Sequence, residues 1–121
     1  MVSDRKGTER RRREFRGQLR ALGRAPLMRG SLVERLRRCG RSNCACARDP
    51  GARHGGKFLT VQLDGRTHAV HVRPEDEESV RQAIAAYHQL WDVINGLTAC
   101  ELGELRRQVR ERHRARQRRK A

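Results

Sequence analysis

Three of the four cysteines in this chain fall within eight residues, and a histidine follows them: Cys39, Cys44, Cys46 and His54. Thiolate sulfur and imidazole nitrogen are ligands of tetrahedral Zn²⁺, and Cys₃His is a known type of structural zinc site. The Cys-x4-Cys gap is common in such sites, whereas the Cys-x-Cys gap is tighter than usual. The pattern predicts that these four residues hold one zinc ion per chain.

Other interpretations of the same thiols stay open. Cys39 could form a redox pair with either of the other two thiols, since neighbouring arginines lower a thiol pKa. The thiols could be inert and buried, or could bind an iron–sulfur cluster, although such clusters usually take four cysteines. His68 and His71 are alternatives to His54 as the fourth ligand. Cys100 lies far along the chain, and we interpret it as a small buried residue.

The chain is strongly basic, with Lys+Arg 29 against Asp+Glu 14 and a net charge of +15. Residues 1–24 and residues 101–121 each carry nine bases and three acids, whereas residues 25–100 carry eleven bases and eight acids. Such a charge favours anionic partners, although arginine-rich codon usage would also produce it. We expect DNA or RNA as the partner. The arginines expected to contact phosphates are Arg10, Arg11, Arg12, Arg13, Arg35, Arg37, Arg38, Arg41, Arg106, Arg107 and Arg110.

Several classes of function are disfavoured. No stretch approaches the ~20 apolar residues of a membrane span, and the first residues lack the apolar segment of a secretory signal, so we expect a cytoplasmic protein with no membrane partner. No Ser/His/Asp set is visible, and a zinc ion with four protein ligands has no open position for a substrate. We therefore expect a protein that is not an enzyme and has no small-molecule substrate.

A β-hairpin is the clearest local signal, over residues 57–72. Asp64-Gly65 is a favoured two-residue type I′ turn, and β-branched and apolar residues flank it. The turn predicts the register Leu63–Arg66, Val61–His68 and Leu59–Val70. One face then carries Leu59, Val61, Leu63, Val70 and Val72, and this face must be covered because an isolated hairpin is marginal.

The segment before the cysteines is ambiguous. Ser31 and Glu34 form a capping box, which favours a short helix over residues 31–38. The alternative is a strand that leads into the Cys39-Gly40 turn, where glycine allows the positive φ of a metal knuckle.

A helix is predicted to begin after Pro74, because four acidic residues follow the proline. Its apolar stripe, which we expect to cover the hairpin, contains Val80, Ile84, Tyr87, Leu90, Trp91 and Ile94. Asn95-Gly96 is a predicted stop, and Thr98 with Glu101 is a second capping box. This pattern predicts helices at about 75–95 and 99–117, or one bent helix from 75 to about 116.

The quoted stretches "RGSLVERLRRCGRSNCACARDPGARHGGKF" and "VRPEDEESVRQAIAAY" resemble a small bacterial and archaeal family of unknown function, over about residues 28–97. Its pattern is Cys-Gly-x3-Cys-x-Cys followed by His-Gly, a Gly hairpin and a helix after a proline. The resemblance implies a zinc module with ligands Cys39, Cys44, Cys46 and His54, an association with transposons, and a strand at 31–38. The family's aromatic run is reduced here to Phe58, which disfavours base stacking.

The expected fold is α+β: a small antiparallel sheet, made of the strand at about 31–38 and the hairpin at 57–72, with a zinc knuckle and one or two following helices. The expected domains are a basic N-terminal tail or frayed helix (1–24), a zinc-binding hairpin and helix domain (28–97) and a basic C-terminal helix or tail (98–121). Phe15, Leu19 and Leu22 would share one face of the first helix. As an alternative function, the helices at 75–109 would bind a second copy or a transposase.

Overall fold

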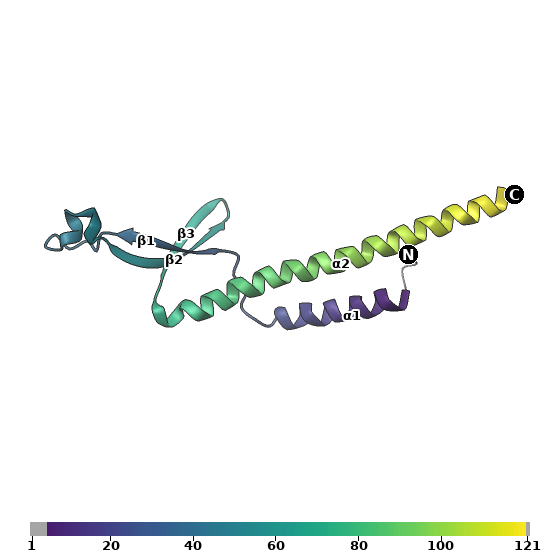
Figure 1. The fold of residues 1–121 in the computed structure, drawn as a ribbon, viewed down its shortest axis with the longest axis horizontal. Coiled ribbons are helices and arrows are strands. Elements are labelled where there is room, and N and C mark those ends of the chain that lie inside the picture. Colours follow the sequence, from purple (N-terminus) through teal and green to yellow (C-terminus); the bar gives the residue numbers. More distant parts are fainter. Residues whose placement is uncertain (1–4, 121) are drawn as a thin grey trace. The chain divides into compact units, whose positions relative to one another are not determined.

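A computed structural model describes residues 5–120; the outermost residues of the two predicted terminal segments, 1–4 and 121, lie outside the described part. The main elements are α1 (Arg5–Leu22), β1 (Ser31–Arg37), β2 (His54–Leu63), β3 (Arg66–Val72) and α2 (Pro74–Lys120) (Figure 1). The chain divides into two compact units. We call Leu27–Tyr87 the sheet unit, and the described residues before and after it the helical unit. Helix α2 begins in the sheet unit and ends in the helical unit.

The sheet unit contains one antiparallel sheet with the strand order β1-β2-β3. Its β2–β3 register has Leu63 opposite Arg66, Val61 opposite His68 and Leu59 opposite Val70, as the turn predicted. Residues 31–37 form a strand, and the alternative of a short helix there is wrong. The expected α+β class is therefore confirmed.

The hairpin turn has the backbone that its two residues predicted. Asp64 has a φ of 54° and Gly65 a φ of 75°, and a type I′ turn requires positive φ at both central positions. The apolar face of the hairpin is only partly covered, however. Leu59 and Val72 are buried, whereas Leu63 and Val70 are exposed.

Helix α2 runs without interruption from Pro74 to Lys120, so the single-helix alternative is correct and the stop at Asn95-Gly96 is not used. The predicted start is confirmed, with Glu75, Asp76 and Glu77 in the first turn. Thr98, which we interpreted as a cap, donates from Oγ1 to the Ile94 carbonyl oxygen four residues earlier (2.9 Å). A side chain bonded in this way lies within a helix and does not start one.

The predicted apolar stripe of α2 is half-buried at every position except Trp91: Val80, Ile84, Tyr87, Leu90 and Ile94 are all partly covered. The buried residues of this helix are Ala83 and Ala86 in the sheet unit and Val93 and Cys100 in the helical unit. Trp91, which the stripe included, keeps 49 % of its surface exposed. The most deeply buried positions of α2 are therefore occupied by its smaller side chains.

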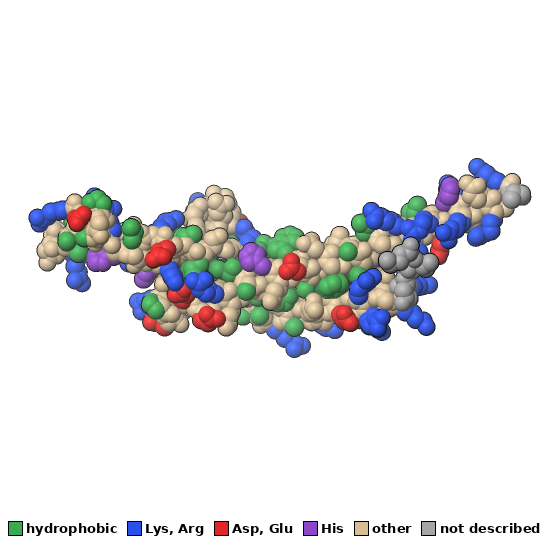
Figure 2. Space-filling view, in the orientation of Figure 1, with side chains coloured by type: hydrophobic (Ala, Val, Ile, Leu, Met, Phe, Trp, Pro, Cys, Tyr) green, Lys and Arg blue, Asp and Glu red, His purple; other side chains and the backbone are tan. Residues whose placement is uncertain are grey.

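In the helical unit, α1 lies alongside α2 in the opposite direction, with hydrophobic side chains gathered between the two helices (Figures 1 and 2). Phe15, Leu19 and Leu22 are all half-buried, which confirms the predicted face of α1. A Cβ atom at Gly96 would lie 2.4 Å from Cζ of Phe15, so the Phe15 ring rests directly on the α2 backbone. Over residues 5–120, no helix is long and apolar enough to span a membrane.

Candidate metal centre

The pairing of β1 with β2 brings the ends of the cysteine segment together. Arg37, the last residue of β1, lies opposite His54, the first residue of β2. The connection over residues 38–53 therefore leaves and re-enters the sheet at one point. Cys39 is the second residue of this connection and His54 directly follows its last residue, so the strand register alone places two of the predicted ligands close to each other.

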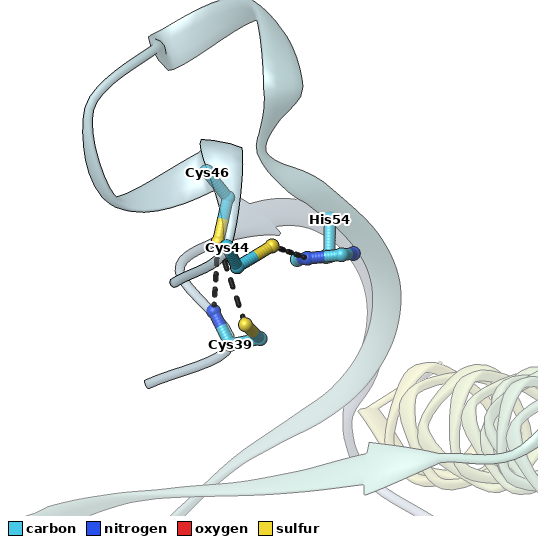
Figure 3. A group of neighbouring side chains, drawn as sticks. All are labelled: Cys39, Cys44, Cys46 and His54. Atoms are coloured by element: carbon cyan, nitrogen blue, oxygen red, sulfur yellow. Dashed lines mark hydrogen bonds between the residues drawn. The ribbon is translucent and has the colours of Figure 1, made fainter. Parts of the chain in front are cut away.

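All four predicted ligands meet at this point (Figure 3). Their ligand atoms lie within 4.8 Å of one another. The two closest pairs are Cys44 Sγ and His54 Nε2 at 3.3 Å, and Cys46 Sγ and Cys39 Sγ at 3.5 Å. In a tetrahedral site with Zn–S bonds of about 2.3 Å, neighbouring ligand atoms lie roughly 3.8 Å apart. The cluster therefore has the dimensions of a metal site.

The backbone around the cluster is shaped for sulfur ligands. Gly40 has a φ of 88°, as the Cys-Gly knuckle predicted. The N–H of Cys39 donates to Sγ of Cys46 (3.3 Å), which stabilises negative charge on that sulfur. Two short 3₁₀ turns, Ala45–Ala47 and Pro50–Ala52, complete the connection. The side chain of Asp49 accepts a hydrogen bond from the N–H of Gly51 (2.9 Å) and so caps the second turn.

The environments of the thiols differ. A hydrogen bond from the backbone of Cys46, with a further one from His54, lowers the pKa of Cys44 to about 6. Cys46 is fully buried. The N–H of Cys39 lowers the pKa of Cys46, but burial and the adjoining thiols outweigh this effect and raise it. Three thiols this close ionise together only when a cation offsets their charge, so the donor set fits a metal ion.

The alternative ligands lie elsewhere. His71 is opposite Phe58, with ring centroids 5.2 Å apart, so it packs against that ring and is not part of the cluster. His68 is an exposed residue of β3 and is not part of the cluster. Cys100 is 6 % exposed within the helical unit, as expected of a small buried residue. A redox pair would not require His54 at the thiols, whereas a metal site does.

Four of the predicted phosphate-binding arginines lie in β1 or in the connection that contains the Cys₃His cluster. Arg35, Arg38 and Arg41 are exposed. The guanidinium carbon of Arg37 lies 5.5 Å from the centre of the Phe58 ring, a cation–π contact. With Arg37 on its face and His71 beside it, Phe58 already has aromatic and cationic neighbours.

Two of the predicted phosphate-binding arginines are engaged by carboxylates in the helical unit. Arg12 binds Glu9 and Glu101, with Nε 2.7 Å from a Glu101 oxygen, and its side chain is only 13 % exposed. The hydrogen bonds that Arg12 donates to these two carboxylates raise its pKa. The ion pair was missed, although Arg12 continues the i, i+3, i+7 face of Phe15 and Leu19.

Arg107 is the second engaged arginine. Its Nη2 lies 2.5 Å from Oε1 of Glu104, and its Nη1 lies 2.6 Å from Oε1 of Glu111. The hydrogen bond to Glu104 is the main cause of the raised pKa of Arg107. The remaining predicted arginines of the helices are exposed: Arg10, Arg11, Arg13, Arg106 and Arg110.

Comparison with known proteins places the chain among its relatives. A family model described as "Domain of unknown function (DUF6788)" matches residues 5–82. The match begins at α1, so it extends further toward the N-terminus than the resemblance at residues 28–97, and it includes all four residues of the Cys₃His cluster. No curated protein and no solved structure gives a significant match. Since the model covers more than half of the sequence, the chain belongs to the DUF6788 family, a domain of unknown function.

Proposed function

We propose that this chain is a small, non-enzymatic zinc-binding protein that binds nucleic acid through its arginines. Three thiols and one imidazole at mutual distances below 4.8 Å support zinc as the metal, because this donor set is typical of structural zinc sites. Cys39, Cys44, Cys46 and His54 would hold the ion. Four protein ligands close the coordination sphere, which is why the proposal includes no catalysis.

The zinc would stabilise the sheet unit. That unit buries few residues: Cys46, Leu59, Val72, Ala83 and Ala86. A core this small gains from a metal, since the free energy of metal binding becomes free energy of folding. Because Cys39 follows β1 and His54 begins β2, an ion bound to both residues would hold β1 against β2.

The observation that carries the nucleic-acid proposal is the charge of α2 beyond Leu105. The segment 106–120 holds nine basic residues and one acid, Glu111. Every basic residue in it except Arg107 is exposed. Like charges four residues apart, such as Arg110 and Arg114, destabilise a helix. A polyanion would remove this repulsion, so the helix is suited to a phosphate backbone.

Two further sets of bases would add phosphate contacts. Lys6, Arg10, Arg13 and Arg20 are exposed and follow one another at helical spacing on α1. Arg35, Arg38 and Arg41 are exposed in β1 and in the connection that follows it. These sets lack exposed aromatic partners for bases, so we expect binding with strong salt dependence and little sequence preference. The transposon association implied by the sequence resemblance favours an accessory role in a mobile element.

The zinc proposal is tested by elemental analysis of protein purified under reducing conditions. We expect about one zinc per chain, as for other closed structural sites. A Cys44→Ser/Cys46→Ser variant should lose the ion and the β-sheet signal. The matched control is Cys100→Ser, which removes a thiol outside the cluster and should keep the zinc. Metal-free wild-type protein with an intact sheet would contradict the proposal.

The nucleic-acid proposal is tested by fluorescence anisotropy with duplex DNA and single-stranded RNA of random sequence, over a range of salt concentrations. Neutralising Arg110, Arg114 and Arg118 to Gln should weaken binding and reduce the slope of log K against log salt by about 3. The control variant Arg73→Gln/Arg81→Gln removes bases that lie close to Glu75 and Glu77. Its slope should stay near that of the wild type. A wild-type slope near zero would refute phosphate binding.

A further inference from the structure

One side of α2 carries apolar side chains that stay half exposed in the helical unit. Leu102 keeps 45 % of its surface exposed, Leu105 53 % and Val109 48 %, and Trp91 begins the same line at 49 %. Asn95 and Thr98 lie between them and are also exposed. We call these six residues, Trp91, Asn95, Thr98, Leu102, Leu105 and Val109, the seam.

The seam has the spacing of a coiled coil. Its residues follow one another at intervals of four, three, four, three and four, which places them alternately at the d and a positions of a heptad. Val93 and Cys100, which are buried, fall at f positions, on the opposite side of the helix. The seam is about 27 Å long at 1.5 Å per residue. Arg112 and Arg116 occupy the next two core positions and end it.

We propose that the seam binds the seam of a second copy of this chain, forming a parallel two-stranded coiled coil. In the parallel arrangement each residue meets its own counterpart. Asn95 then faces Asn95 of the partner subunit, and the amides can hydrogen-bond to each other. Asn at a single a position is a known determinant of register and oligomeric state in coiled coils.

The antiparallel arrangement fits the same residues poorly. It would place Asn95 opposite Leu105 of the partner subunit and Thr98 opposite Leu102 of the partner subunit. A buried amide facing leucine loses its hydrogen bonds to water without replacement, which is costly. Matching polar with polar and apolar with apolar layers therefore favours the parallel pair.

The charges beside the seam favour the same orientation. Glu101 lies at a g position and Arg106 at the following e position. In a parallel pair these positions face each other across the interface, so Glu101 can pair with Arg106 of the partner subunit, twice by symmetry. In the antiparallel pair Glu101 would face Glu101 of the partner subunit. Glu101 already binds Arg12, but its side chain remains 59 % exposed.

The parallel pair also brings two copies of the basic segment 106–120 close together. Their repulsion is screened by salt, so association should strengthen when the salt concentration rises from about 0.05 M to about 0.5 M. This dependence is opposite to that expected of nucleic-acid binding. The self-association proposal does not depend on nucleic acid, and its test is made without it.

The first test is the mass of the full-length, metal-loaded chain in solution, by sedimentation equilibrium and light scattering. The chain mass is 14.0 kDa, and we expect twice this value at high salt. Leu105→Asp should give the monomer mass with an unchanged helix signal, since Leu105 is half exposed. The matched control is Leu63→Asp, which changes an equally exposed leucine of the hairpin and should remain dimeric. A monomeric wild type, or a dimeric Leu105→Asp variant, would overturn the proposal.

The second test fixes the orientation by mild oxidation of single-cysteine additions. In a parallel pair Asn95→Cys crosslinks to itself, and a mixture with Leu105→Cys gives no mixed product. An antiparallel pair gives only the mixed 95–105 product and would refute the parallel arrangement. The unsubstituted chain supplies the background, because its Cys100 is buried and its other cysteines lie outside the seam.

Discussion

Replacement of Gly96 by alanine should destabilise the helical unit, although alanine is the better helix former. A Cβ atom at this position would lie 2.4, 2.6 and 2.8 Å from three atoms of the Phe15 ring. An aromatic ring cannot bend out of the way, so α1 would have to move away from α2. Gly103 is the matched control, since it lies in the same helix and a Cβ atom there would have no neighbour within 4 Å.

Both substitutions gain helix propensity, but only Gly96→Ala also introduces a steric clash. Glycine to alanine inside a helix gains about 1 kcal/mol at either position. Overpacking costs typically 1–3 kcal/mol, and it applies to Gly96 alone. Gly103→Ala should therefore raise stability by about 1 kcal/mol, and Gly96→Ala should lie about 1–3 kcal/mol below it. For a domain near this size, 1 kcal/mol corresponds to a shift in Tm of about 4 °C.

Thermal and urea unfolding followed by far-ultraviolet circular dichroism would measure the difference. A double-mutant cycle isolates the contact: with Phe15→Ala in place, Gly96→Ala should become as stabilising as Gly103→Ala. Equal stabilisation by the two glycine substitutions in the wild-type background would refute the close packing of Phe15 on Gly96.

Three other perturbations have defined outcomes. Lys57 and Arg81 lower the pKa of Glu77, and Arg107 lowers the pKa of Glu104. Both ionised carboxylates therefore stabilise the fold at pH values above their ordinary pKa of 4.5, and this stabilisation is lost as the pH falls through the lowered pKa values. Glu104→Gln should make Tm fall less steeply at acidic pH, and an unchanged decrease of Tm would contradict this pairing. Arg12→Gln should lower Tm several-fold more than Arg13→Gln, because only Arg12 is held by Glu9 and Glu101; equal decreases would show that the ion pairs contribute little. A zinc chelator should lower the Tm of the sheet unit while the helix signal at low temperature persists, and calorimetric traces that coincide with and without chelator would argue against a structural metal.

Local signals were sufficient to predict the hairpin, whereas they left residues 31–38 ambiguous, and the strand there was favoured by the family resemblance. The Asp64-Gly65 turn determined the hairpin register, because a two-residue loop leaves one pairing. The acids after Pro74 predicted the start of α2, since they complement the helix dipole. The four residues of the Cys₃His cluster were also found from their spacing, because they lie close in sequence and the turn chemistry of Gly40 is visible there.

Long-range packing could not be predicted in the same way. The Asn95-Gly96 pair is typical of a helix end, but Gly96 lies inside α2. Its lack of a side chain leaves space for the ring of Phe15, which lies 81 positions earlier in the sequence. Arg12 belongs to a run of arginines that is typical of phosphate binding, yet it forms an ion pair with Glu101 of the other helix. In both cases the decisive partner lies on the other helix, and periodicity within one segment contains no information about it.

The unequal connections of the sheet have a consequence for its edges. β2 joins β3 through a two-residue turn, whereas β1 reaches β2 only after residues 38–53, so closing the β1 side costs more chain entropy. The proposed metal, bound to Cys39 and His54, would offset this cost. When zinc is scarce, β1 should detach first, and β2 changes from a central strand to an open edge with unpaired N–H and C=O groups. Open edges recruit strands from other molecules, so the proposed zinc would also act as a safeguard against aggregation.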